Sequence, residues 1–217
     1  MNPETQILYL AAGLFVLTGI GTLWRRELTA VIRLLAVQGF ALAGIVGSLA
    51  LAERELELAF VAAGLAALRG LILPALAKRA LEASGAGRET RPLVNVTASL
   101  VAAAALALLA FAVSRPVVAL ADTAAAKAVP VALTVVFCGF FALTTRRHAL
   151  SGVTGFLLID NGITAIAFLT TTGIGLLVEI GVSLDVLGAV LVLAILTGRM
   201  RTAFGGTDLS DLKELRD

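Results

Sequence analysis

Several residue types that build common catalytic and metal sites are scarce in this sequence. Cys138 is the only cysteine and His148 the only histidine among 217 residues. A single cysteine excludes an intrachain disulfide and a cysteine-ligated cluster, and a single histidine excludes a histidine-based metal site. The chain also lacks a flavin or nucleotide motif, so any redox chemistry has to reside in partners. We expect no cofactor in this chain and no enzymatic activity of its own.

Charged residues are also few, and apolar residues fill the sequence instead. The chain is 15% charged and 59% hydrophobic, with a mean hydropathy of +0.99. In lipid, only helices or closed barrels satisfy all backbone groups, and strand-length alternation of apolar and polar residues is absent here. The composition therefore predicts an all-α, polytopic membrane protein.

Seven apolar segments have the length that a membrane helix needs, about 17–25 residues. They are Thr5–Trp24, Leu28–Leu51, Leu58–Ala77, Leu93–Ser114, Ala128–Thr145, Ala149–Thr171 and Ile174–Gly198. The fifth is the shortest, and a count of six spans that loses one of the seven is the alternative. The connections between them leave no room for a soluble domain, so we expect a bundle of about seven transmembrane helices.

The distribution of lysine and arginine predicts the orientation of this bundle. With the N-terminus outside, the inner connections and the tail hold twelve of these residues, and the outer connections hold three. The positive-inside rule then holds at every connection, which predicts a prokaryotic plasma-membrane protein with a cytoplasmic C-terminus. The basic inner face implies contact with anionic lipid headgroups and not with nucleic acid.

A short motif indicates internal duplication. Residues 24–26 (WRR) separate the first and second spans, and residues 145–147 (TRR) separate the fifth and sixth, 121 residues later. An offset of four spans preserves direction, so the pattern predicts two parallel three-helix repeats. The expected units are residues 1–91, a linking helix in 92–127, a second three-helix unit in 128–198 and a cytoplasmic tail in 199–217.

Two aspartates are the strongest candidates for function. Asp160 and Asp185 stand near the centres of the last two spans, which a short turn separates. Residues equidistant from the turn of an antiparallel hairpin lie at equal depth, and a charge at mid-bilayer costs about 3 kcal/mol on insertion scales. The pair predicts proton or ion handling, in which case amide substitutions should spare assembly and impair proton movement. The alternative is a pair of neutral acids that hold two helices together by hydrogen bonds.

Four other polar residues within the spans are further candidates for proton handling, namely Gln38, Arg69, Arg33 and Glu179. Gln38 and Arg69 are equidistant from the turn after the second span, so they are expected at one depth. Arg69 either snorkels to the inner interface or pairs with an acid of a neighbouring chain. Arg33, five residues inside the second span, either snorkels or faces the bundle. Glu179, five residues inside the seventh span, either reaches the outer interface or handles protons.

Several stretches resemble a known family. Residues 155–163 (GFLLIDNGI), 178–187 (VEIGVSLDVL) and 208–217 (DLSDLKELRD) resemble hydrogenase-4 component E, and residues 33–39 (RLLAVQG) look like the second helix of that family. The family is similar to the K-type subunit of respiratory complex I and to the C subunit of Mrp-type cation/proton antiporters. In those relatives two helices each carry a membrane-embedded acid.

The resemblance implies a place for this chain in a larger assembly. Asp160 and Asp185 match the two K-type acids, although the family usually shows glutamate at the position of Asp160. The implied role is a membrane-arm subunit of a hydrogenase-4 or formate-hydrogenlyase complex that contributes to proton translocation. Its partners would be large antiporter-like subunits and hydrogenase-type peripheral redox subunits. A subunit of a multi-subunit antiporter and a structural spacer without an ion path are the alternatives.

Overall fold

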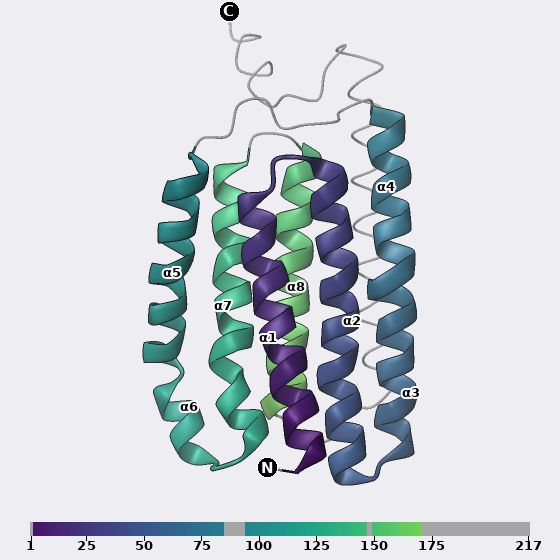
Figure 1. Cartoon of the computed structure of the whole chain (residues 1–217), viewed down its shortest axis with the longest axis vertical. Coiled ribbons are helices and arrows are strands. Elements are labelled where there is room, and N and C mark those ends of the chain that lie inside the picture. The colour runs from purple at the N-terminus through teal and green to yellow at the C-terminus, as the bar shows by residue number, and fades with distance from the viewer. Residues whose placement is uncertain (1, 85–93, 147–148, 171–217) are drawn as a thin grey trace, which may run out of the picture.

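The computed structural model describes residues 2–84, 94–146 and 149–170, and every regular element within these ranges is helical (Figure 1). The elements are α1 (Pro3–Trp24), α2 (Leu28–Glu53), α3 (Leu56–Leu65), the π-helix η1 (Ala66–Ile72), α4 (Leu73–Ser84), α5 (Val96–Val113), α6 (Arg115–Leu120), α7 (Ala124–Thr145) and α8 (Ala149–Thr170).

Six stretches of the described chain are helical, long and apolar enough to cross a membrane. The elements α3, η1 and α4 form the third of them, and α5 with α6 forms the fourth. These six confirm the first six predicted spans. The fifth, α7, has 22 residues and begins four residues before its predicted start at Ala128. The predicted seventh span, Ile174–Gly198, and the predicted tail lie outside the described residues.

Side-chain caps and proline explain where several of these helices begin. The Asn95 side chain accepts a hydrogen bond from the Ala98 amide at 2.7 Å and caps α5. The Thr123 hydroxyl accepts one from the Ala126 amide at 3.1 Å and caps α7. Both residue types satisfy amides that a first helical turn leaves without a partner. Pro116 lies in the first turn of α6, where its missing N–H costs nothing.

The helices run up and down as a single bundle (Figure 1). Helices α1, α2, α7 and α8 form its centre, where α1 contacts α2 and α7, and α8 contacts α7 and α2. Helix α5 flanks the α7 side, and the third span flanks the α2 side. Phe15, Leu42, Val135 and Leu158 are completely buried, one from each central helix. The core therefore sits among the four central helices.

Glycine allows α7 and α8 to approach each other at backbone distance. A Cβ on Gly155 would lie 2.8 Å from the Leu143 nitrogen, and one on Gly162 would lie 2.9 Å from the Val136 nitrogen. A Cβ on Gly139, from the opposite helix, would meet the Ile159 nitrogen at 2.7 Å. Small residues at such contacts are a main source of helix association in lipid. Gly139, Gly155 and Gly162 thus serve helix packing within the chain.

The bounds of the central helices repeat at a fixed interval. Adding 121 residues to the first and last residues of α1 gives those of α7, and adding 121 to the first residue of α2 gives that of α8. The two hairpins also touch at their turns, where Arg146 Nη2 donates to the Arg25 carbonyl oxygen 121 residues away at 3.3 Å. Helices α1 and α7 therefore correspond in both bounds, and α2 and α8 correspond where they begin.

Candidate functional site

A buried ion pair lies near the middle of the bundle. Arg69 of η1 and Asp160 of α8 are joined through Nη1 and Oδ2. The Arg69 side chain is 1% exposed and that of Asp160 is 13% exposed. Arg69 is close to the centre of the third span, and Asp160 is close to the centre of α8. Both charges thus lie far from either end of the helices that carry them.

Neutral side chains of α8 complete the binding of the guanidinium group. Arg69 Nη1 also donates to the Asn161 side-chain oxygen at 2.8 Å, and Nη2 donates to the Thr164 hydroxyl at 2.9 Å. Asn161 is 4% exposed and Thr164 is 5% exposed. Hydrogen bonds to an ionised group are stronger than those between neutral groups. One face of α8 therefore presents three acceptors to a single arginine.

The hydrogen bonds continue across the bundle through Gln38. Asn161 Nδ2 donates to Gln38 Oε1 at 3.0 Å, and Gln38 Nε2 donates to the Phe15 carbonyl oxygen at 3.3 Å. Gln38 has no exposed surface. We call Gln38, Arg69, Asp160, Asn161 and Thr164 the polar network. It links α2, η1 and α8 to each other and to the backbone of α1.

A local change of helix type and one glycine bring Arg69 into this position. Residues Ala66–Ile72 form a π-helix, and Pro74, just beyond it, has no N–H for the carbonyl four residues earlier. Short π-helical segments inside α-helices are frequently found at functional sites. Across the contact, a Cβ on Gly39 would lie 2.4 Å from the carbonyl carbon and oxygen of Arg69. The missing side chain lets the backbone of η1 rest on α2.

The charges of the polar network constrain what it can do. Arginine keeps its proton under all ordinary conditions, so Asp160 is the only titratable member. If Asp160 took up a proton, the network would keep a buried positive charge with neutral acceptors only. An unpaired buried charge is strongly unfavourable. A proton at Asp160 is therefore linked energetically to the position of the Arg69 guanidinium.

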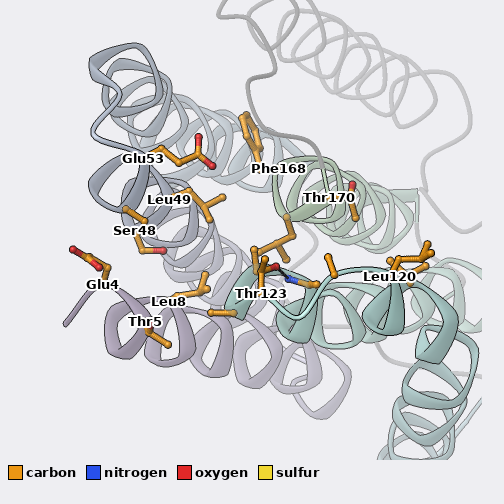
Figure 2. A pocket seen from close by; sticks show the side chains of 17 residues that line it. Glu4, Thr5, Leu8, Ser48, Leu49, Glu53, Leu120, Thr123, Phe168 and Thr170 are labelled. Atoms are coloured by element: carbon orange, nitrogen blue, oxygen red, sulfur yellow. Dashed lines mark hydrogen bonds between the residues drawn. The ribbon is translucent and has the colours of Figure 1, made fainter. Parts of the chain in front are cut away.

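Two cavities lie on either side of the polar network along the bundle. One, of about 10 Å³, is lined by Leu35, Arg69, Leu73, Pro74, Ala77, Leu157 and Asn161. That volume holds about one water molecule. The other, of about 540 Å³, lies at the end of the bundle where α1 begins and α8 ends. Figure 2 shows Leu8, Leu49 and Phe168 around it and Glu4 at its edge. Phe168 is one helical turn beyond Thr164, about 6 Å along α8.

The structure brings together three of the residues singled out in the sequence. Asp160 and Arg69 pair directly, and Gln38 joins them through Asn161. Arg69 is buried, so the expectation that it snorkels was wrong. The expectation that it pairs with an acid of a neighbouring chain was also wrong, because its acid is Asp160 of the same chain.

Other predicted residues do not join the polar network, or lie beyond the described part. Arg33 is exposed on α2, away from the polar network. Asp185 and Glu179 lie outside the described residues, so the shared depth of Asp185 with Asp160 and the two interpretations of Glu179 stay predictions. Asn161 and Thr164 were not predicted as members of a functional site. The sequence does contain a signal for these two residues, since positions 160, 161 and 164 place three polar side chains near one face of an apolar helix.

Comparison with known proteins gives one relative over almost the whole chain. The sequence is 51% identical over 210 residues to the Mycobacterium tuberculosis protein described as "Uncharacterized protein Rv0085". The match covers 95% of this chain and 94% of that protein. No family model matches the chain. No solved structure matches it either.

Proposed function

This chain belongs to the same family as the Mycobacterium tuberculosis protein Rv0085, and we propose that it is a non-catalytic membrane subunit of a complex I-related assembly of the hydrogenase-4 or formate-hydrogenlyase type. In that assembly it contributes to proton translocation or its coupling. The observation that carries this proposal is the Arg69–Asp160 ion pair, buried near the middle of two membrane-length helices.

The energetic cost of the pair supports a role beyond packing. Charged residues within the membrane are rare and expensive, and those that persist mark ion and proton pathways. A buried ion pair can often be replaced by apolar residues without loss of stability. Four further polar groups, from Gln38, Asn161, Thr164 and the Phe15 carbonyl, are nevertheless arranged around this pair or linked to it. We infer that the charges themselves are used.

The proposed coupling works through Asp160. When a proton neutralises Asp160, Arg69 loses its counter-charge. The guanidinium group is then stabilised by pairing with another acid, in this chain or in a neighbouring subunit. Movement of charge in a neighbour thereby favours or opposes proton uptake at Asp160. The large cavity near Phe168 and the small cavity at Arg69 provide room for water on both sides of the polar network. The partners in this proposal are large antiporter-like subunits and hydrogenase-type redox subunits.

A structural role is the second candidate. The hydrogen bonds of the polar network join three helices and the backbone of a fourth, which is the arrangement expected of a pin that fixes the bundle. In this alternative the chain is a spacer subunit without an ion path. A subunit of a multi-subunit cation/proton antiporter is the remaining possibility, and it uses the same ion pair without redox partners.

The duplication and the orientation complete the proposal. We propose seven spans in two parallel three-helix repeats, which the 121-residue offset between the bounds of α1 and α7 supports. We also propose a prokaryotic plasma membrane with the N-terminus outside. Arg25, Arg26, Lys78, Arg79 and Arg146 lie at one end of the described bundle, and acids dominate the other end. Reporter fusions after residues 24, 54 and 122 test the orientation, and an outside signal after residue 24 would contradict it.

The experiment compares single and double neutralisation of the ion pair in the complex purified through a tag on this chain. Asp160→Asn alone should reduce accumulation, because it leaves a buried arginine without its counter-charge at a cost of about 3–5 kcal/mol. This differs from the expectation drawn from the sequence, where an amide was thought to spare assembly. Arg69→Gln/Asp160→Asn should recover accumulation, since both partners are then neutral and can still bond.

Proton movement in sealed vesicles then separates the two candidates. The double variant should assemble with normal subunit content and fail to move protons, whereas Asp160→Glu should keep both properties. Asp122→Asn is the matched control, since Asp122 also pairs with a basic residue, Lys127, but at the surface. If the double variant retained normal proton-coupled activity, the polar network would be a structural pin.

A further inference from the structure

A groove lies on the surface of the bundle where α5, α6 and α7 meet. It has a volume of about 480 Å³, which is within the usual range of small-molecule sites. Its lining residues lie between Leu108 and Pro130, inside the stretch 94–146 that the structure describes without a gap. The groove shares no lining residue with the large cavity near Phe168. It is thus a separate feature, built from one continuous part of the chain.

Two neighbouring residues end α5 and change the direction of the chain beside this groove. The Ser114 hydroxyl donates to the Ala110 carbonyl oxygen at 2.7 Å, and such bonds to the preceding turn often bend helices. Pro116 follows and has no N–H for the carbonyl oxygen of Ala112. Helix α6 therefore leaves the line of α5 and leads across to the start of α7 (Figure 1). The groove lies in the angle that this bend creates.

The walls of the groove are apolar, and its charge comes from two basic residues. Leu108 is 74% exposed and Phe111 is 53% exposed on the α5 side. Arg115 of α6 is exposed and forms no ion pair with a described residue. Lys127 of α7 lies 2.6 Å from Asp122, which balances its charge. No acid lines the groove within the described part of the chain, so its unbalanced positive charge is that of Arg115.

The basic residues lie where two membrane helices meet the headgroups. The predicted fourth span ends at Ser114 and the predicted fifth span begins at Ala128, so Arg115 and Lys127 stand next to the ends of the two apolar segments. Long basic side chains at the ends of membrane helices extend to the interface. Leu108 and Phe111 precede Arg115 on α5, toward the middle of the membrane. The groove therefore combines a cation at headgroup level with an apolar surface at the level of the lipid tails.

We propose that this groove binds an anionic membrane phospholipid, with the phosphate at Arg115 and an acyl chain along Leu108 and Phe111. The planar guanidinium group binds phosphate through two parallel hydrogen bonds. An anionic headgroup is favoured over a zwitterionic one, because the zwitterion brings its own positive charge close to Arg115. A phospholipid is favoured over free phosphate, because only the lipid also covers the apolar walls. The proposal does not depend on proton movement through the polar network or on which side of the membrane holds the N-terminus.

A tryptophan placed in the groove reports which lipid occupies it. Trp24 is the only tryptophan of the chain, and it ends α1 at the end of the bundle opposite α6 (Figure 1), so Trp24→Phe removes the background signal. Phe111→Trp introduces the reporter at a half-exposed aromatic position. The full-length variant is reconstituted into phosphatidylcholine vesicles that contain a fixed fraction of brominated phosphatidylglycerol or, in parallel, of brominated phosphatidylcholine. Bromine quenches tryptophan fluorescence at short range, so phosphatidylglycerol should quench the reporter more strongly at equal fraction.

Substitution of Arg115 in this reporter protein tests the assignment. Arg115→Gln should reduce the preference for phosphatidylglycerol about fivefold, the effect expected for one basic residue near the membrane surface. Arg115→Lys should keep most of it. Arg54→Gln is the matched control, because Arg54 is an exposed arginine at the same end of the bundle, in the turn between α2 and α3, and does not line the groove. Equal loss in Arg115→Gln and Arg54→Gln would place the effect in overall charge and overturn the site.

The same quenching experiment distinguishes other occupants of the groove. Equal quenching by the two brominated lipids would overturn the proposal. Weak quenching by both would show that protein, either a second copy of the chain or a partner, covers the groove in place of lipid. Addition of inorganic phosphate at constant ionic strength should leave the excess quenching by phosphatidylglycerol in place. If inorganic phosphate abolished that excess, the groove would be a site for free phosphate and the lipid assignment would be wrong.

A second measurement needs no reporter and so stands if the tryptophan variant does not fold. Phosphatidylglycerol added to the full-length protein in detergent should raise the melting temperature more than phosphatidylcholine does, because a ligand that binds the folded state stabilises it. Arg115→Gln should remove most of this difference, and Arg54→Gln should retain it. Equal melting temperatures with the two lipids would overturn the proposal.

Discussion

Replacing Gly39 by alanine should displace Arg69 from the polar network. The new Cβ would lie 2.4 Å from the carbonyl carbon and oxygen of Arg69 and 2.7 Å from the nitrogen of Gly70. These are backbone atoms, which cannot swing aside as a side chain does. Ordinary carbon contacts need about 3.5–4.0 Å, so α2 and η1 have to separate by about 1 Å.

The hydrogen bonds that Arg69 donates to α8 do not tolerate a displacement of about 1 Å. Arg69 donates to Asn161 at 2.8 Å and to Thr164 at 2.9 Å, and an added 1 Å takes both beyond the useful range. Overpacking costs about 1–3 kcal/mol, and each lost hydrogen bond to a charged group adds about 1.5–3 kcal/mol. We expect a total destabilisation of about 4 kcal/mol or more.

The assay heats the full-length protein in detergent to a series of temperatures. Size-exclusion chromatography then measures the monodisperse fraction that remains after each temperature. Gly64→Ala is the matched control, because a Cβ on Gly64 of α3 meets nothing within 4 Å. Gly39→Ala should melt well below the unmodified protein, and Gly64→Ala should melt close to it. Equal melting temperatures for the two variants would refute the idea that contact with Gly39 positions Arg69.

Three further predictions concern other parts of the bundle. Gly155→Ala should lower the melting temperature, because its Cβ would meet a backbone nitrogen of α7 at 2.8 Å, whereas Gly152→Ala meets only a side-chain carbon at 3.8 Å and should have little effect. Cys138, which is fully buried, should resist a maleimide reagent in the folded protein and react after denaturation in SDS; rapid labelling of the folded protein would contradict this packing. The hydrogen bond and the charge of Lys127 hold the pKa of Asp122 below its ordinary value, so the stabilisation is present at neutral pH and is lost as the pH falls through the lowered pKa. Lys127→Met should raise that pKa, as measured by carboxyl NMR, and an unchanged value would show that the pair does not form in solution.

The sequence by itself predicted the helices because hydropathy reports directly on the length of apolar segments. The first and second predicted spans begin and end within two residues of the bounds of α1 and α2. The π-helix was missed, since its composition resembles that of an α-helix and nothing in the local pattern marks the wider turn. The four extra residues of α7 were missed because Lys127 interrupts the apolar run.

For the site, the sequence determined which residues are costly in lipid and at what depth they lie. The positions of Gln38, Arg69 and Asp160 within their spans follow from counting residues from each turn. Their partners do not follow, because a residue's depth leaves open which neighbouring helix it faces. The pairing of Arg69 with Asp160 joins residues 91 positions apart. It depends on the π-helix, on the bare backbone of Gly39 and on the packing of α8 between α7 and α2. Only the tertiary structure decides those contacts, since they arise from the shapes of surfaces that meet after the helices have formed.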